Sequence, residues 1–229
     1  MLVSRIIAID GPSGAGKSTV ARAVAQVLRI PTLDTGAMYR AITLAALDRG
    51  VDIHDGAACG ALARSVRLEL DGRVLLDGQD VTEEIRTPRV TEAVSAVSAH
   101  PEVRTALVAH QRAWAQQQGA GVVDGRDIGS VVFPDAVLKV FLTASDEARA
   151  RRRQRDEEAA GRHMPLDEVR RDIERRDRLD STRPTSPLVA PPDAVVIDTT
   201  DLGVGDIVDR IVELYRERTR EGGEAGAGS

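Results

Sequence analysis

The chain has 229 residues, of which 42% are hydrophobic and 29% are charged, and these values match an ordinary globular domain rather than a disordered or fibrous protein. Its one cysteine, Cys59, excludes an internal disulfide framework and a four-cysteine zinc site. No apolar run approaches the roughly 20 residues of a membrane-spanning helix, and the apolar run at 6–9 is too short for a secretory signal. We therefore expect a cytoplasmic protein that does not associate with membranes.

The charge balance points away from nucleic acid as a partner. The net charge is −5 and aromatic residues make up 2% of the chain, which is unlike a nucleic-acid-binding protein. Lys17 and Lys139 are the two lysines, so 29 of the 31 basic residues are arginine. Because guanidinium groups bind phosphate in a planar, bidentate geometry, the positions where arginines cluster are informative about function.

Short apolar runs alternate with amphipathic stretches along most of the chain. The apolar runs predict buried strands, which are expected at 6–9, 121–123, 137–142 and 194–197. The amphipathic stretches predict helices, which are expected directly after residue 17 and at 101–118, 145–160 and 166–178. Strands that alternate with helices in this way are typical of an α/β fold with a parallel sheet and helices on both faces.

One interval breaks this alternation. The stretch 33–122 is far longer than a single crossover helix requires, so it must contain an insertion. Within it, apolar runs at 66–70 and 74–76 flank Asp71-Gly72, which is a hairpin turn signal. We predict a small antiparallel subdomain at about 60–90, and a disordered tail at 217–229 because its glycine-rich sequence has little to bury.

A phosphate-binding loop follows the first predicted strand. Gly11, Gly16, Lys17 and Ser18 form the pattern G-x-x-x-x-G-K-S, and a predicted helix follows them. In such a loop successive backbone N–H groups point at phosphate oxygens, Lys17 bridges the β- and γ-phosphates, and the Ser18 hydroxyl binds Mg²⁺. The expected nucleotide-binding residues are Gly11, Pro12, Ser13, Gly14, Ala15, Gly16, Lys17, Ser18 and Thr19. The sheet is therefore predicted to be of the P-loop NTPase type, with a nucleoside triphosphate as the ligand.

Two arginines are expected beside this loop. Arg40 follows a predicted second strand, and Arg126 follows the predicted strand at 121–123. Since ligands bind outside the carboxyl ends of parallel strands, both side chains would be available to a second anion. A hydrolysing switch has no use for a second anion pocket, whereas a kinase has one for its phosphoryl acceptor.

The stretch 145–155 is dense in arginine. It opens with Ser145, an expected N-cap, and an acidic first turn, and it continues with five arginines. One interpretation is a solvated helix face. The other is a lid whose arginines neutralise the transferring phosphoryl group, an effect worth about 10³–10⁵ in rate in the best cases. The candidates for that role are Arg149, Arg152 and Arg153.

Five motifs taken together resemble bacterial cytidylate kinases. They are Gly-Pro-Ser-Gly-Ala-Gly-Lys-Ser-Thr (11–19), Leu-Asp-Thr-Gly-Ala-Met-Tyr-Arg (33–40), Asp-Val-Thr-Glu-Glu-Ile-Arg (80–86), Asp-Gly-Arg-Asp-Ile-Gly (124–129) and Val-Phe-Pro-Asp-Ala (132–136). The resemblance covers about residues 3–215, and the hairpin region is similar to the monophosphate-binding insert of those enzymes. It implies a core at 1–58, 101–144 and 184–216, an insert at 59–100, a helical lid with its following helix at 145–183, and the tail at 217–229.

The resemblance also implies a reaction and a set of roles. The reaction would be phosphoryl transfer from ATP to CMP, and also to dCMP, with Mg²⁺ and with a monomeric enzyme. The residues implied to contact CMP are Thr35, Tyr39, Arg40, Ser95, Arg104, Arg126, Asp127, Arg176, Asp180 and Arg183. Among them, Ser95, Arg104 and Asp127 match positions that recognise cytosine, whose N4 amine needs an acceptor. Asp124 matches a carboxylate that lies near the magnesium-bound waters.

Two other functions compete with this interpretation. The first is a P-loop kinase for a different small acceptor, such as UMP, AMP or shikimate; the insert together with Ser95, Arg104 and Asp127 argues against shikimate. The second is a binding module that senses ATP without turning it over. Arginines in three separate clusters argue against a sensor, because a sensor has no transferring phosphoryl group to neutralise.

Overall fold

The computed structural model describes residues 5–70 and 72–225. The chain divides into two compact units. Unit 1 comprises Met1–Thr32, Gln118–Thr182 and Ser186–Ser229, and unit 2 comprises Leu33–Gln117 and Arg183–Thr185. None of the helices in the described ranges combines the length and the apolar character that a bilayer crossing requires.

A five-stranded parallel sheet forms the centre of the fold, and its strand order is β2-β6-β1-β7-β8. The strands are β1 (Arg5–Asp10), β2 (Thr32–Asp34), β6 (Ala120–Gly125), β7 (Leu138–Thr143) and β8 (Val195–Asp198). In the register, Ile9 of β1 lies opposite Asp124 of β6 on one side and Val140 of β7 on the other. This central position explains why β1 is a continuous apolar run, since both faces of the strand are covered.

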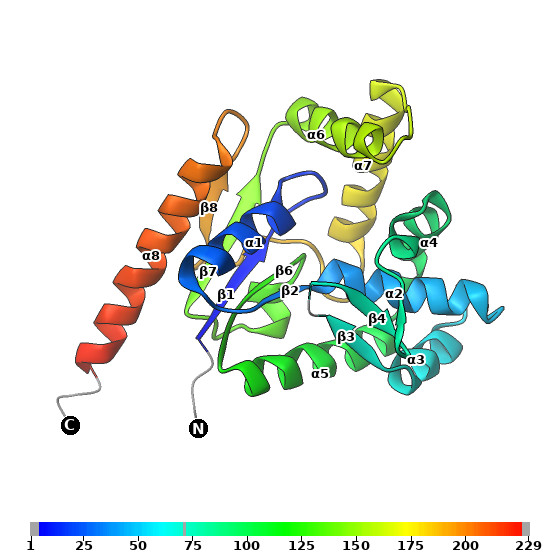
Figure 1. Ribbon diagram of the computed structural model, residues 1–229, viewed down its shortest axis with the longest axis horizontal. Coiled ribbons are helices and arrows are strands. Elements are labelled where there is room, and N and C mark those ends of the chain that lie inside the picture. The colour runs from blue at the N-terminus through cyan, green and yellow to red at the C-terminus, as the bar shows by residue number, and fades with distance from the viewer. Residues whose placement is uncertain (1–4, 71, 226–229) are drawn as a thin grey trace. The chain divides into compact units, whose positions relative to one another are not determined.

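Helices α1 (Lys17–Leu28) and α8 (Val204–Ala225) lie side by side against the sheet in unit 1 (Figure 1). α1 buries an apolar stripe that includes Val20 and Val24, and α8 buries Ile207 and Ile211 in the same core cluster. The residues of each pair are four positions apart and therefore lie on one face of their helix, which makes each helix amphipathic. This layer fixes the start of α1, and therefore the loop that precedes it.

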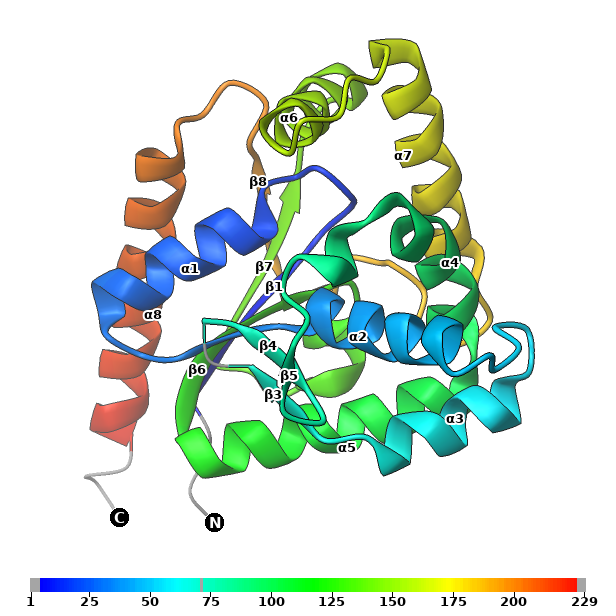
Figure 2. The ribbon, with the colours of Figure 1, turned by 45° about the vertical axis from the view of Figure 1, so that its right-hand side comes forward.

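Helices α6 (Asp146–Ala159) and α7 (Leu166–Thr182) form a helical hairpin in unit 1, which Figure 2 shows as adjacent ribbons. Ser145 caps α6, because its hydroxyl accepts a hydrogen bond from the backbone N–H of Ala148 at 3.3 Å. The hairpin has a small apolar cluster of its own, built on Ala150, Val169 and Ile173. Most of its other side chains are charged, so its position depends on polar contacts with the rest of unit 1.

Unit 2 combines helices with a small antiparallel sheet of order β3-β4-β5. Its elements are α2 (Thr35–Asp48), α3 (Gly56–Ser65), β3 (Leu68–Leu70), β4 (Val74–Leu76), β5 (Gln79–Asp80), the 3₁₀ helix η1 (Glu84–Arg86), α4 (Pro88–Ala99) and α5 (Pro101–Gln118). α2 is the centre of the unit and contacts α3, β4, η1 and α4. Asp34 caps α2 by accepting a hydrogen bond from the N–H of Ala37 at 3.0 Å.

The predicted fold class is confirmed, and so are the predicted strands, the helix at 101–118 and the hairpin at 68–76. Two differences concern extent. The region 60–90 is antiparallel only over β3–β5 and is otherwise mainly helical, and Asp71 of the hairpin turn lies outside the described residues. The chain at 217–225, where disorder was expected, continues α8, in which Arg218 donates a hydrogen bond to the carbonyl of Val137 at 3.2 Å. The remainder of the tail, 226–229, lies outside the described residues.

Candidate active site

The loop at 11–16 joins β1 to α1 in a conformation that depends on its glycines. Gly11, Gly14 and Gly16 all have positive φ angles, and Gly16 caps α1 in the left-handed region. A Cβ atom on Gly11 would lie 2.1 Å from the carbonyl oxygen of Leu142, so the loop passes directly against β7. The N-terminus of α1 is thereby presented to the space that the loop encloses, as anion binding requires.

Lys17 is buried at the first residue of α1 and donates a hydrogen bond from Nζ to the carbonyl of Pro12 at 2.7 Å. Burial lowers the pKa of Lys17, and the neighbouring guanidinium of Arg126 lowers it further, while the carboxylates of Asp124, Asp10 and Asp180 oppose the shift. The ammonium group is therefore held among charges at the carboxyl ends of β1 and β6.

Ser18 and Asp124 form an oxygen-rich pair beside Lys17. The Ser18 hydroxyl donates a hydrogen bond to Oδ2 of Asp124 at 2.7 Å, and Asp124 is 3% exposed at the end of β6. A hydroxyl and a carboxylate are the donors that Mg²⁺ prefers, and Mg²⁺ usually completes its coordination with water and substrate phosphates. The pair therefore fits Mg²⁺, although no group of three or more metal-ligating side chains occurs in the part of the chain that the structure describes.

Arg126 follows β6 and is held by α7. Its Nε donates a hydrogen bond to Oδ2 of Asp180 at 2.9 Å, and both side chains are mostly buried. The neighbouring Arg176 on α7 is half-buried, and loss of solvent around its guanidinium together with the charge of Arg126 lowers the pKa of Arg176 to about 10. Nε of Arg176 forms no hydrogen bond within the described residues, and its guanidinium also lies within electrostatic range of Arg153. Unit 1 thus holds a series of cations, namely Lys17, Arg126, Arg176 and Arg153, each repelled by the next.

The three predicted lid arginines lie on α6, and each is engaged by protein groups. Arg149 bonds to the carboxylates of Asp177 and Asp146 and to the carbonyl of Ser13. Although burial opposes it, hydrogen bonding to the two carboxylates raises the pKa of Arg149 above its usual value. Two further contacts complete the set: Arg152 donates to the hydroxyl of Thr199 at 2.8 Å, and Arg153 pairs with Glu157 at 2.5 Å.

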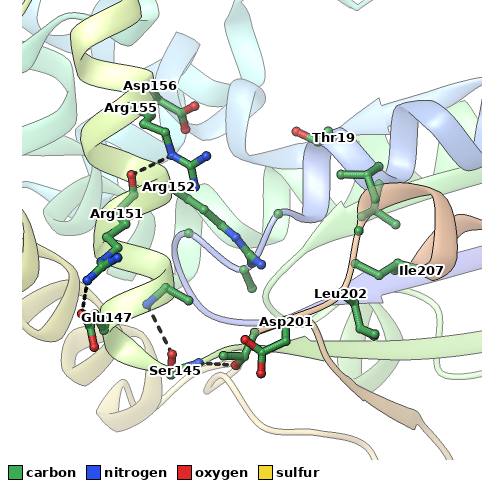
Figure 3. Close-up of a pocket in the computed structure, with 18 residues that line it drawn as sticks. Thr19, Ser145, Glu147, Arg151, Arg152, Arg155, Asp156, Asp201, Leu202 and Ile207 are labelled. Carbon is green, nitrogen blue, oxygen red and sulfur yellow. Dashed lines mark hydrogen bonds and ion pairs between the residues drawn. The ribbon is translucent and has the colours of Figure 1, made fainter.

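A pocket of about 870 Å³ lies between the phosphate-binding loop, α6 and the segment 200–204 that follows β8. Figure 3 shows the Arg152 side chain reaching from α6 into this pocket, while Arg151 turns back to pair with Glu147. Leu202 and Ile207 lie on the opposite wall (Figure 3). The pocket therefore offers charged groups on one side and apolar side chains on the other, which suits a nucleoside attached to phosphate.

The sequence analysis did not identify the segment after β8, which begins at Thr199, as part of the site. Thr199 is fully buried, and its hydroxyl donates a hydrogen bond to the carbonyl of Thr143 at 3.0 Å while it accepts one from Arg152. The available signal was its position directly after the strand at 195–198, because ligand-binding segments follow the carboxyl ends of parallel strands.

Asp10 is a second residue that the sequence did not single out. Its carboxylate is 2% exposed and accepts hydrogen bonds from the N–H groups of Ile128 at 2.8 Å and Gly129 at 2.7 Å. Burial raises the pKa of Asp10 to about 6, although these hydrogen bonds oppose the shift. The carboxylate thereby attaches the end of β1 to η2 (Ile128–Val132), a turn of π-helix directly after Arg126 and Asp127.

Unit 2 contains most of the residues predicted to bind the acceptor. Arg40 on α2 donates hydrogen bonds to the carbonyl of Ile85 at 3.0 Å and to the hydroxyl of Thr91 at 2.9 Å. The guanidinium of Arg104 lies 5.3 Å from the ring centroid of Tyr39, in cation–π geometry. The other predicted residues of this unit are Thr35, buried in the first turn of α2, Ser95, half-buried on α4, and Arg183, which is 8% exposed.

The predicted site residues therefore fall into two sets. Unit 1 brings together the phosphate-binding loop, Asp124, Arg126, Arg176 and Asp180, with Asp127 buried directly after Arg126. In unit 2, Tyr39 lies beside Arg104, and Arg40 bonds to Ile85 and Thr91 of the predicted insert at 59–100.

Comparison with known proteins gives matches over most of the chain. The sequence model of the cytidylate kinase family matches residues 7–217. A cytidylate kinase of Mycolicibacterium paratuberculosis is 51% identical over 219 residues, which span 93% of this chain and 96% of the relative. A cytidylate kinase of Geobacillus kaustophilus is 53% identical over 218 residues, with the same shares covered. Among solved structures, an uncharacterised protein of Eubacterium ventriosum matches with a TM-score of 0.50 at 13% identity, over 92% of this chain and 98% of that one, which is a likeness of fold.

Proposed function

The chain belongs to the cytidylate kinase family, and we propose that it transfers the γ-phosphoryl group of ATP to CMP and dCMP, giving ADP and CDP or dCDP. The observation that carries this proposal is the series of cations from Lys17 through Arg126 and Arg176 to Arg153, beside a phosphate-binding loop. Cations that repel one another in a buried place are stabilised when an anion binds among them. Two phosphorylated substrates supply that charge.

The donor nucleotide is assigned to unit 1. The N–H groups of the loop and the first turn of α1 bind the β-phosphate, and the ammonium of Lys17 turns from the Pro12 carbonyl to the β- and γ-phosphate oxygens. The 870 Å³ pocket takes the nucleoside, with Arg152 on one wall and Leu202 on the other. Ser18 and Asp124 would hold Mg²⁺, the second through water, and the ion would neutralise phosphate charge.

The acceptor nucleotide is assigned to the residues that the family resemblance implies. Arg40 and Arg126 hold the CMP phosphate, and their hydrogen bonds to Thr91, Ile85 and Asp180 fix the direction of each guanidinium. Ser95, Arg104 and Asp127 recognise the cytosine base, with Thr35 and Tyr39 beside the nucleotide. Arg176, Asp180 and Arg183 line the sugar and base. An acceptor for the N4 amine of cytosine would face a carbonyl in uracil, which disfavours UMP.

No general base is required for the chemical step. The nucleophile is an oxygen of the CMP phosphate, which is already anionic at neutral pH because its second pKa is about 6. That oxygen forms a bond to the γ-phosphorus, and the bond between the γ-phosphorus and the β–γ bridging oxygen breaks, so ADP leaves. The protein therefore aligns the two phosphates and neutralises charge with Lys17, Arg126 and two arginines of α6, Arg152 and Arg153.

The test is an ADP-release assay with Mg-ATP and, in separate reactions, CMP, dCMP, UMP, AMP and shikimate, with a control that lacks any acceptor. We expect fast turnover with CMP and dCMP and weak turnover with UMP. Fast turnover with AMP or shikimate would establish a kinase for another acceptor instead. ATP binding without acceptor-dependent turnover would favour a nucleotide sensor. Light scattering of the same preparation tests the expectation that the enzyme is a monomer.

A further inference from the structure

The peptide groups at Ser13 are held from outside the phosphate-binding loop by the helical hairpin. The N–H of Ser13 donates a hydrogen bond to Oδ1 of Asp177 on α7 at 3.0 Å. The carbonyl of Ser13 accepts a hydrogen bond from Nη1 of Arg149 on α6 at 3.0 Å. Arg149 and Asp177 are also bonded to each other. One ion pair thus engages both the donor and the acceptor of a single residue in the loop.

The ion pair is shielded from solvent and its charge is balanced. The side chain of Arg149 is 7% exposed and that of Asp177 is 17% exposed. Arg149 has a second carboxylate partner, because its Nη2 lies 2.5 Å from Oδ1 of Asp146. Two carboxylates therefore bond to this guanidinium, whereas Arg126 and Arg153 bond to one carboxylate each and lie, with Arg176, near other cations. The electrostatics of Arg149 do not favour a further anion.

The backbone of α6 also packs closely on the loop. A Cβ atom on Gly14 would lie 2.9 Å from the carbonyl oxygen of Arg149, and the φ of Gly14 is +77°. Because the loop backbone and the first turn of α6 are in direct contact, a shift of Arg149 would be transmitted to the residues that follow Ser13. Those residues are the ones whose N–H groups are assigned to the β-phosphate.

The spacing on α7 connects this contact with the acceptor side. Asp177 and Asp180 are three residues apart and therefore lie on one face of the helix. Asp177 bonds to the phosphate-binding loop and Asp180 bonds to Arg126. One helix face thus fixes a group assigned to the donor and a group assigned to the acceptor.

We propose that Arg149 and Asp177 are a positioning pair that sets the conformation of the phosphate-binding loop through Ser13, and that Arg149 does not touch the transferring phosphoryl group. This inference rests on the proposed function, because it assigns a role within the same site. It separates Arg149 from Arg152 and Arg153, which remain the arginines of α6 proposed to neutralise phosphate.

The first test is the affinity for ADP by titration calorimetry in Arg149→Lys, in Asp177→Asn and in the double variant. ADP needs the loop but no acceptor, so this readout is independent of CMP phosphorylation. We expect each single variant to bind ADP on the order of tenfold more weakly, and the double variant to bind no more weakly than the weaker single one, because both changes remove one network. At saturating substrates, kcat should stay within about threefold of that of the wild type.

Matched controls come from an exposed pair on the same helix. Arg175 and Asp172 bond to each other at 3.1 Å on the surface of α7. Arg175→Lys and Asp172→Asn therefore make the same two side-chain replacements in an ion pair that is not bonded to the phosphate-binding loop. We expect both to bind ADP as the wild type does. Unchanged ADP affinity in Arg149→Lys with kcat lowered about 1000-fold would assign Arg149 to the phosphoryl group and overturn the proposal. Independent, additive losses in the two single variants would also overturn it.

A measurement on the wild type covers the case in which a variant does not fold. Since Asp177 accepts the Ser13 N–H, that amide should exchange slowly with solvent in the nucleotide-free protein, as measured by nuclear magnetic resonance. Fast exchange of the Ser13 amide would overturn the proposal. If the wild type binds ADP and fails to phosphorylate CMP, the proposed function is wrong, while the positioning of the loop is still decided by the ADP affinities.

Discussion

Nε of Arg126 lies 2.9 Å from Oδ2 of Asp180, and this bond joins the turn after β6 to the end of α7. Both side chains are mostly buried, at 21% and 14% exposure, so water competes little for the bond. The contact leaves the Nη1 and Nη2 ends of the guanidinium for other partners, one of which is the carbonyl of Gly125. Asp180 therefore determines which edge of Arg126 can face an anion.

Replacing Arg126 with lysine tests this geometry. Arg126→Lys keeps the positive charge and removes the Nε–H that Asp180 accepts, together with the bidentate fork. We expect the KM for CMP to rise between about 10-fold and 100-fold, and kcat to fall as well, because the phosphate is no longer aligned. Steady-state kinetics with CMP varied at saturating ATP measures both quantities.

The matched control for this prediction is Arg210→Lys. Arg210 pairs with Glu213 on the exposed face of α8 at 2.9 Å, so the same replacement there should leave both constants unchanged. If Arg126→Lys keeps the KM and kcat of the wild type, charge alone is sufficient at this position. The alignment by Asp180 would then have no catalytic role.

The pair formed by Ser18 and Asp124 predicts a dependence on Mg²⁺. Asp124→Asn keeps an oxygen that can accept the Ser18 hydrogen bond and removes the negative charge. We expect the Mg²⁺ concentration for half-maximal activity to rise about 10- to 100-fold, because outer-shell groups of metal sites have effects of this size. Addition of a chelator should abolish turnover in the wild type.

Activity titrated with Mg²⁺ in the wild type, in Asp124→Asn and in Asp209→Asn measures this effect. Asp209 is exposed on α8 and serves as the control for a change of overall charge. An Asp124→Asn enzyme with the Mg²⁺ requirement of the wild type would show that Asp124 has no part in holding the ion. Its bond to Ser18 would then be structural only.

The parts of the fold that are set by local pattern could be predicted from the sequence. The phosphate-binding loop is one example, because glycine spacing, a preceding apolar run and a following amphipathic stretch all occur within 25 residues of each other. The central strands follow in the same way from their apolar runs, and the helix at 101–118 from its periodicity.

Contacts between residues far apart in the chain could not be predicted in this way. The hydrogen bonds that Asp10 accepts from the N–H groups of Ile128 and Gly129 join residues more than 100 positions apart. The local sequence around Asp10, an aspartate followed by a glycine, does not predict them. Arg149 shows the same difficulty. The sequence placed it among five arginines of similar spacing, and its contacts with Asp177 and Ser13 distinguish it from the others.

The close approach of Gly11 to β7 predicts a large cost for a small side chain. In Gly11→Ala the new Cβ would lie 2.1 Å from the carbonyl oxygen of Leu142, and the φ of +149° is one that alanine rarely adopts. We expect the free energy of unfolding to fall by about 3 kcal/mol or more, since overpacking costs about 1–3 kcal/mol and backbone strain adds to it.

Gly205→Ala is the control, because a Cβ at this position in the first turn of α8 meets no atom within 4 Å and the φ is not positive. There we expect a gain of about 0.5–1 kcal/mol from helix propensity. Urea unfolding followed by circular dichroism compares the two variants. Equal stabilities would mean that β7 moves away from the loop at little cost.

Burial of Asp10 predicts a pH dependence of stability. The pKa of Asp10 is raised from 3.8 to about 6 in the folded protein, so the native state binds its proton more tightly than the unfolded chain does. The contribution of Asp10 is therefore fully present below pH 3.8 and is lost as the pH rises through about 6. Relative to Asp10→Asn, the free energy of unfolding of the wild type should fall by about 2 kcal/mol between pH 4.5 and pH 7.

Urea unfolding of both proteins across this pH range measures the difference, in which the titration of groups distant from Asp10 cancels. Asp80 supplies a control of opposite sign, because hydrogen bonds from the hydroxyl and the N–H of Thr82 hold the pKa of Asp80 below its usual value. Its contribution is fully present above the unfolded pKa of 3.8 and is lost as the pH falls below that value, so the difference between wild type and Asp80→Asn should stay level between pH 4.5 and pH 7. A difference between wild type and Asp10→Asn that also stays level from pH 4.5 to pH 7 would show that the two N–H groups outweigh burial and keep Asp10 ionised.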